Sequence, residues 1–287
     1  MTPSPTWRVG CELGFDVTDP ATVVLQIAPA TSAGDLVEER LDVALDGQPV
    51  DVELLVGDHG TRVHVLRSPI GTRDVRYQAG GTAAPTGAPA PPPAVDPAPA
   101  PHVTTALDTE LLTYLRPSRY CPSDQLSGFA AYELGHLPVG PALLEAVGDW
   151  VASRLTYVPG SSGPLDSAVD SLFAGRGVCR DFAHLAITVL RALEVPARLV
   201  SAYAPGLTPM DFHAVVEAHV DGRWQILDPT RLAPRPSLLR VATGRDATDT
   251  AFITVLGGDA ELVRTEVTAV IDGDLPVDDH RAAVALA

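Results

Sequence analysis

One cysteine lies where a helix is expected to begin. Cys179 follows the glycine-containing segment 175–177 and precedes a run, from Phe182 to Leu193, in which apolar residues recur at steps of three and one. That periodicity predicts a helix with one buried face. Unpaired backbone N–H groups and the helix dipole favour a thiolate at such an N-terminus. The sequence therefore predicts a nucleophile at Cys179.

A base and an orienting acid follow downstream in that order. Residues 211–220 alternate between apolar and more polar positions, which predicts a strand with His213 on its more polar face. The dipeptide Asp221-Gly222 predicts a type I′ hairpin turn. Pairing the two strands across that turn brings Asp228 near the end of the hairpin that carries His213. Cysteine, histidine and aspartate would then serve as nucleophile, base and orienting group.

Five segments within residues 105–270 resemble motifs of the bacterial transglutaminase-like family. They are 177–183, 211–214 with Glu217, 228–230, 117–124 and 242–247. The resemblance implies a papain-like α+β core with a Cys-His-Asp triad at Cys179, His213 and Asp228. The chain departs from the family at Val215, where many relatives have tryptophan. That departure concerns the wall of the acyl-donor groove and therefore the preferred substrate.

Acyl transfer through a thiol also needs donors for the oxyanion. The backbone N–H of Cys179 is expected to be one donor. The sequence does not identify the second, for which Tyr120 and Tyr203 are candidates because they lie in segments similar to the family. Arg180 and Asp181 directly follow the nucleophile. They are expected either to form an ion pair or helix-start hydrogen bonds, or to contact the substrate.

The triad leaves three functions open. In the first, a cysteine protease or amidase hydrolyses a peptide or carboxamide bond through a Cys179 thioester. In the second, a transglutaminase passes the acyl group of a protein glutamine to an amine. Hydrolysis is slightly favoured, because it needs fewer special features. The third is a peptide-binding module without catalysis. Asp211 is an alternative orienting acid to Asp228.

Composition excludes several other classes. The net charge of −16 and the absence of a basic cluster argue against nucleic-acid binding. All 20 cationic residues are arginine. No apolar run approaches the length that spans a membrane. The three cysteines, Cys11, Cys121 and Cys179, show no CxxC spacing, so neither a metal nor another cofactor is expected. Residues 1–6 do not resemble a signal peptide, and a cytoplasmic location is expected. The sequence does not indicate an oligomeric state.

The chain is expected to contain two domains and a linker. Residues 1–78 predict a small β-sandwich, with strands at 7–15, 22–27, 36–45, 50–56, 62–66 and 74–77. Residues 79–101 are mostly alanine, proline and glycine and predict a semi-extended linker. Residues 102–287 predict the catalytic domain. Its helices are expected at 126–134, 142–155, 167–173 and 179–194, and its strands at 197–204, 213–220, 224–227, 251–256 and 262–270. Helices followed by antiparallel strands predict an α+β fold.

Overall fold

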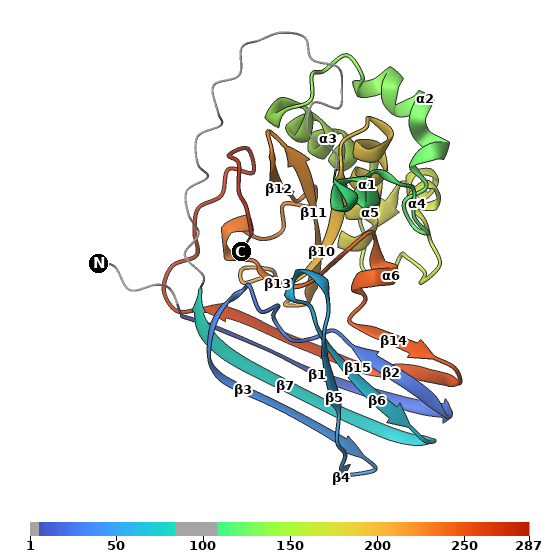
Figure 1. The fold of residues 1–287 in the computed structure, drawn as a ribbon, viewed down its shortest axis with the longest axis vertical. Coiled ribbons are helices and arrows are strands. Elements are labelled where there is room, and N and C mark those ends of the chain that lie inside the picture. The colour runs from blue at the N-terminus through green and yellow to red at the C-terminus, as the bar shows by residue number, and fades with distance from the viewer. Residues whose placement is uncertain (1–5, 84–107, 287) are drawn as a thin grey trace.

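The computed structural model describes residues 6–83 and 108–286, and its strand-rich part is a sandwich of two antiparallel sheets (Figure 1). One sheet has the order β15 (Asp259–Ile271), β1 (Thr6–Asp19), β7 (Gly71–Ala83), β3 (Gly34–Leu45) and β4 (Gln48–Pro49). The other has the order β14 (Ile253–Leu256), β2 (Ala21–Leu25), β6 (Arg62–Ser68) and β5 (Glu53–Val56). Every strand predicted before residue 78 is present.

Strand alternation explains the core of the sandwich. Along β1 every second side chain is buried, and these residues are Trp7, Val9, Cys11, Leu13, Phe15 and Val17. Successive side chains of a strand point to opposite faces, so this pattern buries one face of the sheet and leaves the other to solvent. The buried face packs against apolar residues of β2 and β6, including Val23, Leu25 and Leu66.

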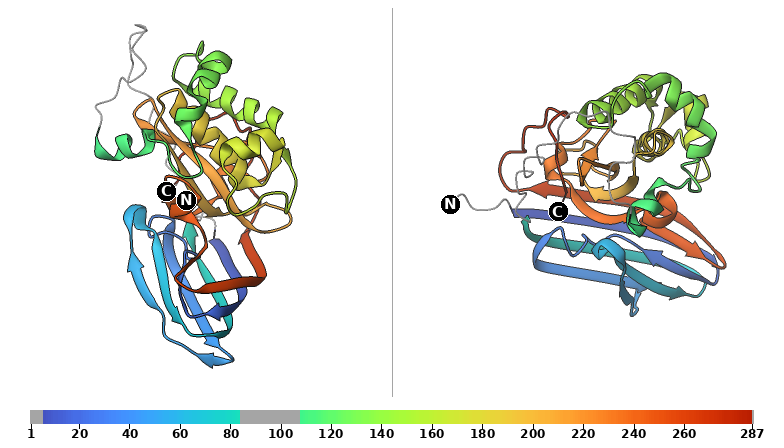
Figure 2. Two further views of the ribbon diagram at one scale, coloured as in Figure 1. Left: turned by 90° about the vertical axis from the view of Figure 1, so that its right-hand side faces the viewer. Right: turned by 45° about the horizontal axis from the view of Figure 1, so that its top comes forward.

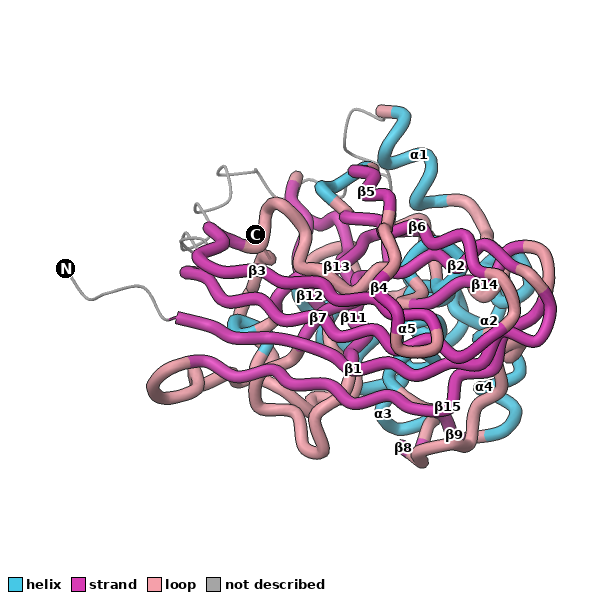
Figure 3. Tube along the Cα trace, turned by 90° about the horizontal axis from the view of Figure 1, so that it is seen from below, coloured by secondary structure: helices cyan, strands magenta, loops and turns pink. Residues whose placement is uncertain are grey.

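The sandwich includes two strands that the sequence analysis assigned to residues 102–287. β15 pairs with β1 along nearly its whole length, from Trp7 opposite Ile271 to Asp19 opposite Asp259. β14 pairs with β2 from Leu25 opposite Ile253 to Thr22 opposite Leu256. The strands themselves were predicted, but alternation along one strand does not identify its partner. Figure 3 shows β3, β7, β1 and β15 side by side.

β7 also extends past the predicted start of the linker at residue 79, since it ends at Ala83. The remainder of that linker, and the expected start of the second domain at residue 102, lie outside the described residues. Among the described residues, no helix combines the length and apolar character that a bilayer crossing requires.

The second part of the fold is a sheet covered by helices, as the α+β prediction required. Its sheet has the order β12 (Arg223–Leu227), β11 (Phe212–Val220), β10 (Ala197–Tyr203) and β13 (Leu239–Gly244). Its longer helices are α2 (Ser123–Leu134), α3 (Pro141–Arg154) and α5 (Cys179–Ala192). The shorter helices are α1 (Thr109–Leu115), α4 (Ala168–Ala174) and α6 (Ala247–Thr250). α1, α6 and β13 were not predicted.

α5 is the central helix of this part. Its side chains from Asp181 to Arg191 are all buried, because it packs between the sheet and helices α2, α3 and α4 (Figure 2). A helix that is buried on every side cannot tilt or shift without disturbing the core. Its N-terminal residue, Cys179, is therefore fixed relative to the sheet.

The two parts of the fold share a buried boundary. Tyr203 at the end of β10 donates a hydrogen bond of 2.8 Å to the carbonyl of Ile27. Leu239 and Val241 of β13 belong to the same apolar cluster as the sandwich core. The C-terminal residues return to the other edge of the central sheet, where Ile226 N–H donates to the carbonyl of Val284 at 2.8 Å.

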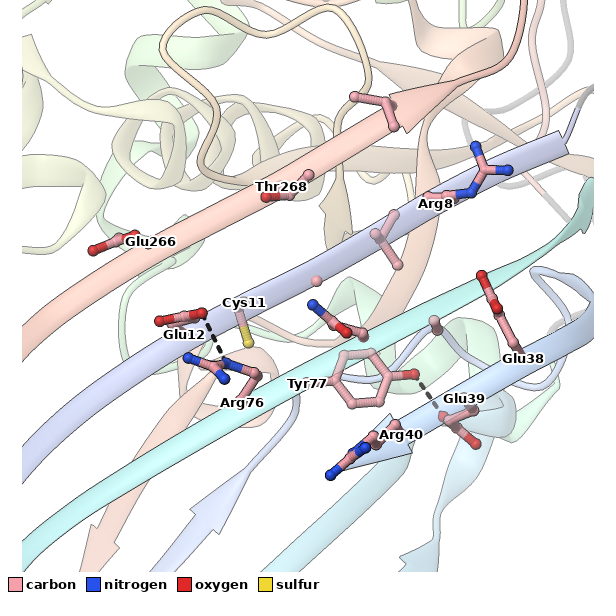
Figure 4. A pocket seen from close by; sticks show the side chains of 15 residues that line it. Arg8, Cys11, Glu12, Glu38, Glu39, Arg40, Arg76, Tyr77, Glu266 and Thr268 are labelled. Carbon is pink, nitrogen blue, oxygen red and sulfur yellow. Dashed lines mark hydrogen bonds and ion pairs between the residues drawn. The ribbon is translucent and has the colours of Figure 1, made fainter. Parts of the chain in front are cut away.

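A pocket of about 540 Å³ lies on the five-stranded sheet of the sandwich (Figure 4). Side chains of β1, β3, β7 and β15 line it. Arg76 donates to Glu12 at 2.8 Å on its surface, and Tyr77 donates to Glu39 at 2.6 Å. Several of the charged side chains that line the pocket are therefore already bound to one another or to Tyr77. The pocket is separate from the residues with triad chemistry.

Candidate active site

Cys179 is the first residue of α5, as the periodicity predicted. Asp181 at the third helical position accepts a hydrogen bond of 2.8 Å from the N–H of Val178, the residue before the helix. A side chain at Gly177 would place its Cβ 2.6 Å from the Cβ of Asp181. Glycine is therefore required at this close approach. The Cys179 thiol is partly buried, whereas the side chains of Cys11 and Cys121 are fully buried.

His213 and Asp228 meet across the hairpin formed by β11 and β12. Asp221 and Gly222 both have positive φ, 54° and 74°, which confirms the predicted type I′ turn. The pairing places Val216 opposite Leu227. Extending this register by one residue puts Val215 opposite Asp228. His213 lies two residues before Val215 on the same face of the sheet, so His213 and Asp228 are diagonal neighbours.

The imidazole and the carboxylate form a buried hydrogen-bonded pair. His213 Nε2 lies 2.8 Å from Asp228 Oδ2, and the other carboxylate oxygen accepts hydrogen bonds from the N–H and the hydroxyl of Thr230 at 2.9 and 2.7 Å. Burial by itself raises the pKa of Asp228, but the His213 ring and the Thr230 donors lower it below its ordinary value. Asp228 therefore stays ionised at neutral pH.

The Cys179 thiol interacts with the same ring. Burial by itself lowers the pKa of His213, but the charge and hydrogen bond of Asp228, with a smaller hydrogen-bonding contribution from Cys179, raise it to about 10. Because Nε2 of His213 is hydrogen-bonded to Asp228, Nδ1 is the ring nitrogen available to the thiol. Among the described residues Nδ1 has no hydrogen-bond partner.

Asp211 is not arranged as the orienting acid. Its carboxylate accepts a hydrogen bond of 2.7 Å from the N–H of Phe212, and burial raises its pKa. Val215, the position that departs from the family, is fully buried with Ile226 and Val200 in a separate apolar cluster. It therefore lies in the core rather than on an exposed groove wall.

Arg180 and Asp181 bind a loop to the start of α5. Arg180 Nη2 donates to the hydroxyl of Ser162 at 2.6 Å and to the carbonyl of Gly163 at 2.7 Å. The Ser162 hydroxyl in turn donates to Asp181 at 2.9 Å, and Arg180 lies 3.3 Å from the same carboxylate. The ion pair and helix-start hydrogen bond expected from the sequence are both present.

Tyr120, in the segment between α1 and α2, contacts the same region. Its hydroxyl donates to the carbonyl of Pro164 at 2.8 Å, and its ring stacks on His184 with ring centroids 5.2 Å apart. Its backbone N–H donates to Asp246 at 2.9 Å. These contacts join two of the sequence motifs, 117–124 and 242–247, behind α5. Because the Tyr120 hydroxyl donates to Pro164, it is not available as an oxyanion donor.

Tyr203 cannot serve as an oxyanion donor. It is fully buried, and its hydroxyl donates to Ile27 in the sandwich core, as described above. The pKa of Tyr203 is raised well above its ordinary value, primarily by burial. A strand was correctly predicted here, but Tyr203 at the end of β10 packs into the apolar core of the sandwich.

Tyr157 is a site residue that the sequence analysis missed. It lies on the short strand β8 (Thr156–Tyr157), which pairs in parallel with β9 (Arg176–Gly177) just before the nucleophile. The Cys179 backbone is a hydrogen-bond partner of its hydroxyl. A two-residue strand has no periodic pattern, so only a tyrosine near a turn was visible in the sequence.

Comparison with known proteins supports the resemblance to the transglutaminase-like family. Residues 140–229 match the transglutaminase-like superfamily. The crystal structure of a candidate cysteine protease from Cytophaga hutchinsonii has a TM-score of 0.84 and 30% sequence identity, and the alignment covers 96% of this chain and 94% of that chain. An uncharacterized protein of Mycobacterium leprae is 34% identical over 146 residues. That match covers 48% of this chain and 52% of the relative, about half the length of each.

A weaker likeness links the chain to the periplasmic domain of TgpA from Pseudomonas aeruginosa, with a TM-score of 0.39 and 19% identity over 82% of this chain and 92% of that chain. It adds nothing about the reaction. The Cytophaga protein, in contrast, matches in sequence and fold over nearly the full length of both chains. The chain therefore belongs to the bacterial transglutaminase-like family, with a strand-rich region preceding its core.

Proposed function

We propose that this protein hydrolyses a peptide or carboxamide bond through a thioester at Cys179. The observation that supports the proposal is the 2.8 Å hydrogen bond between His213 Nε2 and Asp228 Oδ2, on a ring that also interacts with the Cys179 thiol. The carboxylate then orients the imidazole, and the imidazole's other nitrogen remains available to the thiol, as nucleophilic catalysis requires. The cysteine-protease assignment of the similar Cytophaga protein supports the same reaction class.

The first half-reaction forms the thioester. The Cys179 thiolate attacks the carbonyl carbon, and the carbonyl oxygen takes the negative charge beside the Cys179 backbone N–H. The bond from carbon to nitrogen then breaks as the His213 imidazolium gives its proton to the departing nitrogen. Asp228 keeps the ring oriented and stabilises its charged form.

The second half-reaction releases the acyl group. Neutral His213 takes a proton from water, the oxygen of which attacks the thioester carbon. The carbon–sulfur bond breaks and the thiolate is regenerated beside the imidazolium. If a primary amine replaces water, the same steps give a transglutaminase product. Hydrolysis remains our first proposal, because water requires no dedicated acceptor site.

A peptide-binding module without catalysis is disfavoured by the paired acid, base and thiol. Maintaining a buried carboxylate and imidazole costs desolvation energy, which a binding surface does not require. The implied partner is a peptide or protein substrate. A cytoplasmic location stays a prediction.

Mass spectrometry of a peptide library distinguishes these functions. The protein is incubated with the library, with and without a primary amine, alongside Cys179→Ala as the matched inactive variant. Cleaved or deamidated peptides that require Cys179 would support hydrolysis. Amine adducts in place of hydrolysed products would show that the protein is a transglutaminase and not a hydrolase. Equal products from wild type and Cys179→Ala would contradict both.

A further inference from the structure

The backbone on either side of Tyr157 is attached to the segment that leads into the nucleophile. Thr156 N–H donates to the carbonyl of Gly175 at 2.9 Å, and Val158 N–H donates to the carbonyl of Gly177 at 3.0 Å. Parallel pairing places Tyr157 opposite Gly177. Two hydrogen bonds therefore fix Tyr157 beside the turn from which Cys179 begins α5.

The side chain of Tyr157 lies beside the first turn of α5. Its ring lies 6.0 Å, centroid to centroid, from that of Phe182 in the first turn of α5. Its hydroxyl lies within reach of the Cys179 backbone, whose N–H lowers the pKa of Tyr157 by hydrogen bonding. That N–H is the donor to which a tetrahedral oxyanion would bind. An acyl oxygen bound to that N–H would therefore lie beside the Tyr157 hydroxyl.

The hydroxyl is a neutral donor throughout the neutral pH range. Burial raises the pKa of Tyr157 to about 12, and the negative charges of Cys179, Asp211 and Asp228 act in the same direction. Its side chain is nevertheless 38% exposed, so it can shift when a substrate enters. Neither tyrosine considered from the sequence can do this, since the hydroxyls of Tyr120 and Tyr203 are bound to Pro164 and Ile27.

We propose that Tyr157 is the second oxyanion donor. In the resting protein its hydroxyl accepts from the Cys179 N–H. When an acyl oxygen takes that N–H, the hydroxyl turns its own O–H toward the same oxygen, and no proton is transferred. This inference rests on the proposed thioester chemistry at Cys179.

Two reagents separate an oxyanion donor from a residue that only shields or activates the thiol. p-Nitrophenyl acetate acylates Cys179 through a tetrahedral oxyanion, and the burst of p-nitrophenol reports its rate. Iodoacetamide alkylates the same thiol by displacement at carbon, without an oxyanion. The variant is Tyr157→Phe, which keeps the ring. The matched control is Tyr132→Phe on α2, where the side chain is 85% exposed.

We expect Tyr157→Phe to acylate at least about tenfold more slowly, because one oxyanion donor is lost. Its rate of alkylation should stay within about twofold of wild type, because thiolate formation is unaffected. Tyr132→Phe should match wild type with both reagents. Thermal unfolding of each variant checks that the fold is retained.

Three outcomes would overturn the inference. Unchanged or faster acylation of Tyr157→Phe, with a normal wild-type burst, would make Tyr157 only a cover over the N–H. An equal fall in acylation and alkylation would make it a group that activates the thiol. A wild type that is alkylated at Cys179 but gives no burst would overturn the proposed function, and this inference with it.

Discussion

His213 Nε2 and Asp228 Oδ2 lie 2.8 Å apart, and both side chains are almost completely buried. Each group shifts the pKa of the other in the direction that favours the ion pair. A buried imidazole without this carboxylate would favour its neutral form. The charge state of the candidate base therefore depends on one residue of the neighbouring strand.

Replacing Asp228 by Asn should abolish most turnover while leaving the protein folded. The amide cannot stabilise the imidazolium and favours the wrong tautomer, so kcat should fall by about 10³–10⁴-fold. Turnover of the peptide or ester substrate measures the effect, and circular dichroism measures the fold.

Asp211→Asn is the matched comparison for that variant, because its carboxylate contacts the N–H of Phe212 rather than the imidazole. It should lose far less activity than Asp228→Asn. A larger loss from Asp211→Asn would identify Asp211 as the orienting acid. Equal losses of stability and turnover in Asp228→Asn would make Asp228 a structural turn residue.

The His213 ring should titrate far above the ordinary histidine value of about 6.5. Its pKa is raised to about 10 in the folded protein, so its contribution to stability is complete below the unfolded value and is lost as the pH rises through about 10. Histidine NMR titration reports the pKa directly. In Asp228→Asn it should fall, since burial then acts with less opposition. A wild-type ring that titrates near 6.5 would contradict the ion pair.

Cys179 should be the thiol that reacts fastest near neutral pH. Burial raises the pKa values of Cys11 and Cys121 to about 12, so very little of either is thiolate. Brief iodoacetamide labelling, followed by peptide mass spectrometry, should show Cys179 modified at least about tenfold faster than either other cysteine. Urea-unfolded protein is the control, in which all three should react. Preferential labelling of Cys11 or Cys121 in the folded state would exclude Cys179 as the nucleophile.

Glu217→Gln should destabilise the fold strongly. The Glu217 carboxylate is buried between Arg198 and Arg240, at 2.8 and 2.6 Å. Removing its charge takes from both buried guanidinium groups the carboxylate that they share, although Arg198 keeps its 2.6 Å ion pair with Glu110. Breaking a buried pair of this kind costs about 3–5 kcal/mol. Urea unfolding measures the change in the free energy of unfolding.

Asp42→Asn is the control for that variant, because the Arg40–Asp42 pair is solvent-exposed. Its midpoint should stay close to that of wild type, since water and salt screen exposed pairs. A similar effect from both substitutions would mean that burial does not determine the strength of the Glu217 pairs.

Pure protein should form no ladder of self-crosslinked oligomers. The chain contains no lysine, so its N-terminal amine is its sole acceptor for a transglutaminase. Its five glutamines, Gln26, Gln48, Gln78, Gln125 and Gln225, remain as acyl donors. Incubation and denaturing electrophoresis test this directly. Isopeptide-linked oligomers other than those joined through an N-terminus would contradict the acyl-transfer chemistry.

The sequence by itself determined the features that arise from short-range interactions. The spacing of apolar residues after Cys179 located the start of α5, because neighbours three and four positions apart share a helix face. Asp221-Gly222 determined the hairpin turn, because both residues tolerate positive φ. The turn then determined which strand ends meet, and so brought His213 to Asp228.

Tertiary structure decided the features that depend on distant partners. The alternation of β15 predicted a strand but not its pairing with β1, because a buried face specifies hydrophobicity rather than a neighbour. Two tyrosines, Tyr203 and Tyr157, show that the sequence alone does not identify the residues near the nucleophile. The first was a candidate donor and lies in the sandwich core. The second, on a strand too short for a pattern, lies at the Cys179 N–H. Only the packing of separate elements decides which hydroxyl meets the nucleophile.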